Sequence, residues 1–213
     1  MVHLRIIEGY IDKIKIQGPV RGPRKLINKY KKNILKSRPL RVSDLERYLL
    51  LIDDLPGVTA KSVLAPSEDK PSATTMTLIL ADKAFVGHIG TDNRGSKFNG
   101  PYQFSGGLTA NSLLGDHTRT GLQGVITSQT EELLFLNAFY DFPINQEGTR
   151  LFFSGSVSES EPGSSLKQFN INGDSSAMTL RLTHPFFRSR GKNLTGHLGF
   201  TEQGNIDKLI GVC

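Results

Sequence analysis

From residue 84 onward the chain divides into seven stretches of about ten residues in which apolar and polar side chains alternate. A period of two is the pattern of β-strands whose two faces meet different surroundings. One face of each stretch is apolar and the other carries polar residues with glycine and serine, which is typical of transmembrane β-barrels. A soluble β-sandwich also alternates, so that alternative stays open on the pattern alone. The expected strands are 84–92, 102–111, 118–128, 134–142, 150–158, 177–186 and 193–201.

Three arginines, Arg119, Arg150 and Arg181, lie on the polar rows of these stretches. Because the polar face of a barrel strand lines a wet interior, we expect all three to face a lumen. The connectors agree with a barrel: 159–175 is long and polar, whereas alternate connectors such as 145–148 are tight. Long loops at one end and short turns at the other are the pattern of outer-membrane barrels.

Residues 203–213 show no eighth alternating stretch and are left unassigned. Bacterial outer-membrane barrels contain an even number of strands, eight or more, so seven strands cannot close one. An open sheet edge exposes unpaired backbone groups and invites aggregation. We therefore expect this chain to be a portion of a larger barrel.

The chain changes character near residue 82. Residues 1–82 carry 15 Lys and Arg against 9 Asp and Glu, while the remainder carries 11 of each. All twelve Phe lie after this point. A basic, Phe-free part is thus joined to a neutral, Phe-rich part, which predicts a domain boundary.

The first part alternates strand and helix signals. Strands are expected at 9–17, 58–64 and 74–80. One helix begins at Gly22-Pro23 and ends before Pro39, and a second begins with a capping box in which Ser43 is the N-cap and Glu46 reaches back. The order strand, helix, helix, strand, strand predicts a small α+β module. The lysines of the first helix have no aromatic partners for stacking bases, so a solvated face is favoured over nucleic-acid binding.

Several functional classes are not supported by the residues. Apolar runs are too short for a membrane helix, and the single Cys213 provides neither a disulfide framework nor a cysteine zinc site. The five histidines lack metal-ligand spacing, and the adjacent Glu131 and Glu132 point to opposite sheet faces, so no enzyme, metal or cofactor is expected. The N-terminus shows no secretory signal, which predicts either a cytoplasmic protein or a fragment of a longer chain.

Three motifs in order resemble one family. Residues 39–58 resemble the last POTRA module of the two-partner secretion transporters, the hemolysin secretion/activation proteins of Gram-negative outer membranes. Residues 92–100 are similar to that family's first barrel hairpin, and 111–116 to its first periplasmic turn. The resemblance implies a ShlB-type POTRA domain at 8–82 and the N-terminal part of an outer-membrane β-barrel at 83–202. It also implies a barrel of about sixteen strands, within the known range.

The resemblance implies a transporter component rather than an enzyme. Its POTRA module, placed in the periplasm, would recognise an unfolded exoprotein, and its barrel pore in the outer membrane would secrete and activate that exoprotein. Strand addition to a POTRA sheet edge is the expected contact. The expected partners are a hemolysin-like or adhesin-like exoprotein and outer-membrane lipid, with no nucleic acid and no cofactor. The predicted substrate-binding residues are Val58, Thr59, Ala60, Lys61 and Ser62.

Two other functions remain as alternatives. A barrel-assembly insertase shares the POTRA and barrel architecture, although the motifs favour secretion. A soluble protein with a small α+β module fused to a β-sandwich would bind a sugar or another surface.

Overall fold

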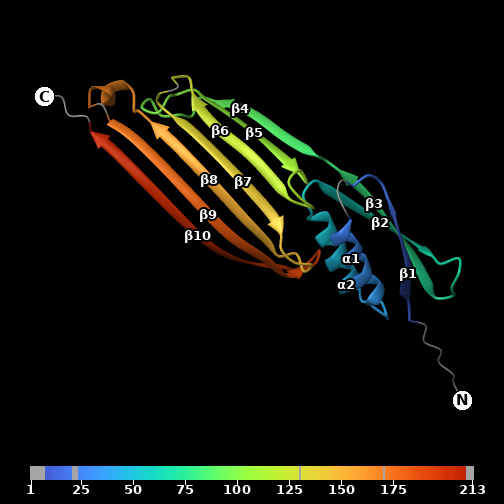
Figure 1. The fold of residues 1–213 in the computed structure, drawn as a ribbon. Coiled ribbons are helices and arrows are strands. Elements are labelled where there is room, and N and C mark those ends of the chain that lie inside the picture. Colours follow the sequence, from blue (N-terminus) through green and yellow to red (C-terminus); the bar gives the residue numbers. More distant parts are fainter. Residues whose placement is uncertain (1–7, 21–23, 130, 170, 210–213) are drawn as a thin grey trace, which may run out of the picture.

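The computed structural model describes residues 8–20, 24–129, 131–169 and 171–209. The chain is mostly β-strand with two helices, arranged as one three-stranded sheet and one antiparallel seven-stranded sheet. Figure 1 shows the small sheet and its helices at one end of the long sheet, with β3 (Ala73–Asp82) leading directly into β4 (Phe85–Asp92). The coarse expectation of an α+β part followed by seven antiparallel strands is confirmed.

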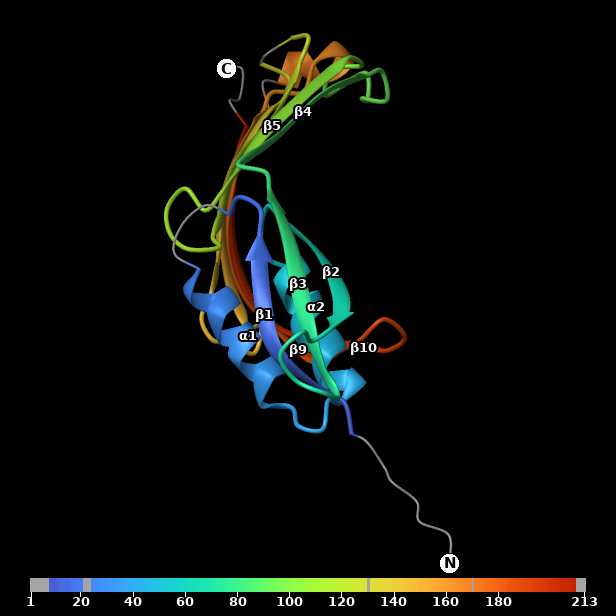
Figure 2. The same cartoon turned by 90° about the vertical axis from the view of Figure 1, so that its right-hand side faces the viewer.

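The first part contains β1 (Tyr10–Gln17), α1 (Lys25–Lys36), α2 (Val42–Asp53), β2 (Val58–Pro66) and β3 (Ala73–Asp82), in that order. In its sheet β3 is central, with β1 parallel to it on one side and β2 antiparallel on the other. Both helices pack on one face of this sheet, and α2 lies between the sheet and the C-terminal end of β9 (Ile171–Arg188) (Figure 2).

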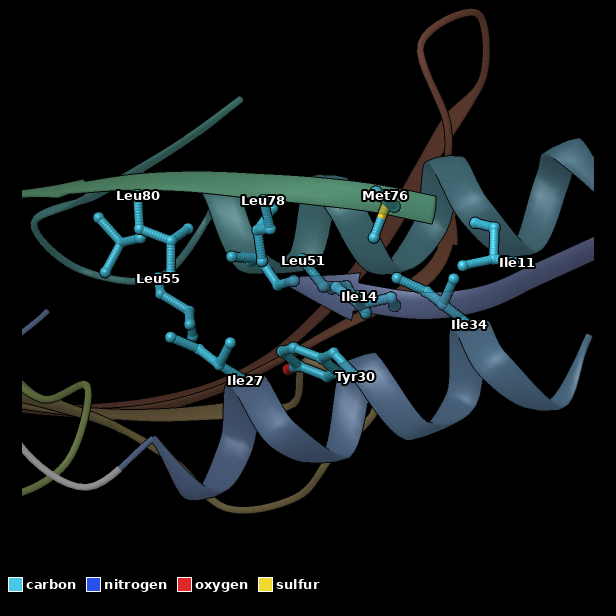
Figure 3. Packing of buried hydrophobic residues seen from close by; sticks show 12 residues of the cluster. Ile11, Ile14, Ile27, Tyr30, Ile34, Leu51, Leu55, Met76, Leu78 and Leu80 are labelled. Carbon is cyan, nitrogen blue, oxygen red and sulfur yellow. The ribbon is translucent and has the colours of Figure 1, made fainter. Parts of the chain in front are cut away.

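A single apolar core holds the sheet and helices together. In α1, Ile27, Tyr30 and Ile34 recur at helical spacing and are all buried, while the lysines occupy the other side. Figure 3 shows these side chains pointing at the sheet. Each buried side chain of this size contributes about 1.5–3 kcal/mol. The full cluster is Ile11, Ile14, Ile27, Tyr30, Ile34, Leu51, Ile52, Leu55, Val58, Met76, Leu78 and Leu80.

The expected capping box of α2 is wrong. The helix begins two residues earlier than expected, at Val42, so Arg41 rather than Ser43 takes the N-cap position, and the Arg41 side chain makes no capping hydrogen bond. The hydroxyl of Ser37 accepts the Arg41 N–H at 3.1 Å and donates to Asp44 Oδ2 at 2.8 Å. Ser43 is therefore inside the first turn of the helix. Ser37, six residues upstream, stabilises this end of the helix in its place. The start expected for the other helix at Pro23 lies outside the described residues.

The long sheet consists of seven antiparallel strands paired strictly in chain order. The strands are β4 (Phe85–Asp92), β5 (Gln103–Asn111), β6 (Arg119–Thr127), β7 (Leu134–Pro143), β8 (Arg150–Ser160), β9 (Ile171–Arg188) and β10 (Asn193–Leu209).

No helix in the described part of the chain is long and apolar enough to cross a bilayer.

The last hairpin is longer than expected. β9 begins at Ile171 rather than 177, and β10 continues to Leu209 rather than ending at 201. Backbone pairing runs on to the pair Ile171↔Leu209 through residues whose side chains no longer alternate. Alternation in the sequence shows that the two faces of a strand have different surroundings. The hydrogen bonds between strands need only backbone groups, so pairing continues where the alternation stops. Residues 203–209 therefore extend β10, and the long connector shrinks to 161–170.

Short turns and longer loops lie at opposite ends of the sheet. The turns 112–118, 144–149 and 189–192 lie beside the first part of the chain, and the loops 93–102 and 161–170 lie at the far end (Figure 1).

Candidate functional site

Strand β2 forms an edge of the small sheet. The strand order β1-β3-β2 leaves the side of β2 away from β3 without a neighbouring strand. An unpaired edge presents backbone N–H and C=O groups that can pair with another extended chain. The expected strand 58–64 is therefore at an edge of the sheet, as strand addition requires.

The register of β2 fixes which backbone groups point outward. Lys83 N–H donates to Gly57 O at 2.8 Å and Ser67 N–H donates to Ala73 O at 2.9 Å, so odd-numbered residues form the hydrogen-bonded pairs with β3. In an antiparallel pair the intervening residues direct their backbone groups to the other side. The N–H groups of Ala60, Ser62 and Leu64 therefore point away from β3.

The first half of this edge is already occupied. Val58 N–H donates to Leu55 O at 3.0 Å, and Ala60 N–H donates to Asp53 Oδ1 at 2.8 Å. Thr59 and Lys61 belong to the class that pairs with β3. Of the five predicted substrate-binding residues, only Ser62 offers an open outward N–H by this register.

The open part of the edge runs from Ser62 to the end of the strand. Val63 and Leu64 are 54% and 50% exposed, so apolar side chains flank the free backbone groups. Pro66 is the last residue of β2 and has no N–H to offer. A docking strand would find two outward N–H groups here, those of Ser62 and Leu64.

The three predicted lumen arginines lie on one face of the long sheet. Arg119 pairs across strands with Asp141, Asp141 with Phe152, and Phe152 with Arg181. Arg150 precedes Phe152 by two residues and shares its face.

Asp141 joins two of these arginines. Its side chain is 8% exposed, and it accepts a hydrogen bond from Arg119 at 3.0 Å and another from Arg150 Nε at 2.9 Å. Arg150 also donates to His117 O at 3.1 Å. Arg181 instead stacks its guanidinium 4.6 Å from the centre of the Phe152 ring. Two cations share one carboxylate and the third rests on an aromatic ring, so this cluster of four charged side chains carries net positive charge.

The opposite face of the long sheet is apolar and exposed. No second sheet covers it among the described residues. A soluble β-sandwich would bury such a face, so the structure does not support that alternative. Its large exposed side chains include Phe104, Leu108, Leu122, Leu136, Phe153, Val157, Leu180, Leu198 and Phe200.

Helix α2 is bound to the turn 144–149 and to the end of β9. Arg47 donates to Pro185 O, Phe186 O and Glu147 O at 3.2–3.4 Å and forms an ion pair with Glu147 at 3.3 Å. Arg188 forms two hydrogen bonds of 2.7 Å with Asp54.

The turn at Gly148 packs closely on the same helix. A Cβ at Gly148 would lie 2.6 Å from the Leu51 side chain, and this glycine has a φ of +85°, so both its space and its conformation require glycine. The contacts of α2 thus tie the small module to the turn 144–149 and to the adjoining end of β9.

Two titratable side chains are buried near this junction. Burial raises the pKa of Tyr30 to about 12, so this tyrosine is uncharged at neutral pH. His117 is 1% exposed, and burial lowers its pKa below the usual value. Neither ring nitrogen of His117 has a hydrogen-bond partner within the described chain. Across those residues no group of three His, Cys, Asp or Glu is placed to hold a metal ion.

Sequence reasoning missed Asp53, Asp141 and Arg47. Asp141 could have been found, because it occupies the polar row of its strand as the arginines do in theirs. Asp53 and Arg47 carry no such signal. Asp53 meets the Ala60 N–H only because the end of α2 lies beside β2, and Arg47 meets Glu147 only because the helix packs on a turn 100 residues away.

A family model described as haemolysin secretion/activation protein ShlB/FhaC/HecB matches residues 80–209, which is more than half of the chain. The chain belongs to this family of two-partner secretion transporters. It is a transporter family rather than an enzyme family, and its barrel relatives belong to the outer membranes of Gram-negative bacteria.

Curated relatives agree with this assignment. The heme/hemopexin transporter protein HuxB of Haemophilus influenzae is 24% identical over 210 residues, covering 97% of this chain. In strain 86-028NP the identity is 24% over 208 residues. The chain spans 37% of the length of these relatives.

Solved structures show the same fold. CdiB from Escherichia coli aligns with a TM-score of 0.71 at 22% identity, covering 94% of this chain and 38% of that one. CdiB from Acinetobacter baumannii has a TM-score of 0.56 at 16% identity, covering 93% and 38%. BamA from Haemophilus ducreyi, lacking POTRA domains 1–3, has a TM-score of 0.57 at 14% identity, covering 92% and 36%.

Proposed function

We propose that this chain is the substrate-recognising and membrane-entering part of an outer-membrane secretion transporter. Residues 8–82 are its ShlB-type POTRA module in the periplasm, and residues from 83 onward are the first strands of its barrel. The boundary at 202 moves to Leu209, because β10 pairs to that residue. The apolar face of the sheet contacts lipid, and the polar face with Arg119, Arg150 and Arg181 lines the pore.

The module captures an unfolded exoprotein by adding one of its segments to the outer edge of β2. The observation that carries this proposal is the open stretch from Ser62 to Leu64, whose outward N–H groups have no strand beside them. Main-chain hydrogen bonds tolerate many sequences, which suits a substrate that arrives unfolded. The exoprotein then passes along the polar face of the barrel.

A barrel-assembly insertase is the second candidate. The likeness to BamA supports the common architecture only, since the identity is 14%. The match to the secretion/activation family over residues 80–209 favours secretion.

Proline substitution at Ser62 tests the proposed edge. In a complete transporter carrying this sequence, we expect Ser62→Pro to lower exoprotein secretion by on the order of tenfold, because proline removes an outward N–H and places its ring there. The module should remain folded, since this N–H does not pair with β3. Secreted exoprotein in the medium and protease resistance of the transporter in membranes are measured together.

Two matched variants separate capture from folding. Lys61→Pro removes an N–H of the class that pairs with β3, so it should make the module protease-sensitive. Ser62→Ala keeps the backbone N–H and should secrete normally. Normal secretion by a folded Ser62→Pro transporter would rule out capture at this edge.

A further inference from the structure

The near end of the β9–β10 hairpin exposes three large apolar side chains. Phe186, Phe187 and Leu194 are 57%, 64% and 53% exposed. Phe187 pairs with Leu194, and Phe186 occupies a register irregularity beside them. They continue the apolar row of β10, in which Leu198 is 75% exposed.

These side chains form one wall of a groove against α2. The groove has a volume of about 820 Å³ and includes Ser43, Asp44 and Arg47 of α2 on its other wall. The walls are fixed in place, because Arg47 bonds to the backbone of Phe186 and Arg188 bonds to Asp54. The groove is therefore a built feature of the junction rather than a gap between loose segments.

Two unpaired cations lie in the turn beside this groove, whose lining also includes Asp44 and the ion-paired Glu147. The turn 189–192 carries Arg190 and Lys192, both exposed, and neither side chain has a hydrogen bond or ion pair within the described residues. Lys192 lines the groove itself. The turns 112–118 and 144–149 each carry an acidic residue and no lysine or arginine. Free cations beside exposed aromatic rings are typical of a membrane surface with negatively charged lipid groups.

We propose that this groove binds one phospholipid molecule of the leaflet that faces the small module. Its acyl chains lie against Phe186, Phe187 and Leu194, and Lys192 and Arg190 bind its phosphate. The inference rests on the proposed insertion of the long sheet in the membrane. An exoprotein segment would use the aromatic wall equally well, but it does not account for the two unpaired cations. The bound lipid would lie between α2 and the hairpin and contact both parts of the chain.

Lipid retention by the complete, detergent-purified transporter tests this proposal. Native mass spectrometry with added phosphatidylglycerol counts the bound lipids and measures their apparent affinity. We expect the double variant Arg190→Gln/Lys192→Gln to lose one retained lipid, with affinity at that site about thirtyfold lower. Phe187→Ser should weaken the same site. The control is Arg94→Gln/Lys97→Gln in a far loop, which makes the same charge change and should retain all lipids.

Each other outcome overturns the proposal. Unchanged retention in the double variant means that the groove holds no lipid. If the double variant loses binding, Phe187→Ser does not, and inorganic phosphate displaces the bound lipid, then the site binds free phosphate. Loss of exoprotein binding with unchanged lipid retention makes it a polypeptide site. Heat-modifiable migration of every variant on gels shows that the barrel is folded. If the unmodified transporter showed no heat-modifiable migration, membrane insertion itself would be refuted.

Discussion

Leu122→Arg should abolish most of the folded barrel, whereas Gln123→Arg, one residue further along the same strand, should be tolerated. Leu122 lies on the apolar face and is 57% exposed, so in the proposed orientation it contacts lipid. Arginine near the bilayer midplane costs about 2–4 kcal/mol. Gln123 shares the polar face with Asn137, to which it donates at 3.3 Å, and arginine there meets water.

Heat-modifiable migration of the complete transporter from outer-membrane fractions measures this difference. The two substitutions insert the same side chain at adjacent positions, so they differ only in the face that receives it. Equal loss of folded barrel from both variants would contradict the face assignment. Loss from Gln123→Arg alone would reverse it.

Asp141→Ala should be the most damaging substitution on the polar face. It leaves Arg119 and Arg150 without their shared carboxylate, which is 8% exposed. Removing one partner of a buried ion pair lowers the free energy of unfolding by about 3 kcal/mol or more. We use the lower end of that range, because Arg119 is half exposed and water compensates part of its charge. We expect a lower urea midpoint for barrel unfolding and a pore with stronger preference for anions.

The control for this prediction is Asp174→Ala on β9. Asp174 is exposed, and its removal changes the net charge by the same amount. The urea midpoint of that variant should match that of the unmodified transporter. A similar midpoint for both variants would mean that the two hydrogen bonds of Asp141 do not stabilise the barrel.

Side-chain alternation was sufficient to predict the strands and the shared face of the three arginines, because both follow from local geometry. It failed at β10, where backbone pairing with β9 continues through Glu202, Gln203 and Asn205 although their side chains no longer alternate. The capping box also failed, because local spacing does not reveal that Ser37 folds back onto Asp44.

The contacts of α2 with β2 and with the long sheet lie beyond sequence reasoning for a different reason. Asp53 meets the Ala60 N–H only because α2 ends beside β2, and Arg47 reaches carbonyls 100 and 138 residues away. These contacts define the open half of the edge and the attachment of the small module to the turns. Both are products of the tertiary fold.

The attachment has a consequence for transport. Arg47 and the Asp54–Arg188 pair join α2 to the near ends of β7, β8 and β9, so the β2 edge is held at a defined place beside the sheet. In the proposed function, a strand captured there would start next to the short-turn end of the polar face. We expect these polar contacts to couple capture to entry into the pore.

Photo-crosslinking from the β2 edge in secreting cells tests the central claim most directly. A photoreactive amino acid at Leu64, with a matched probe at the exposed Lys15 of β1, reports which edge of the small sheet meets the exoprotein during transport. We predict an exoprotein adduct from position 64, none from position 15, and loss of the adduct when Ser62→Pro is added. An adduct from position 15 alone, or one at 64 undiminished by Ser62→Pro, would contradict capture by strand addition at β2.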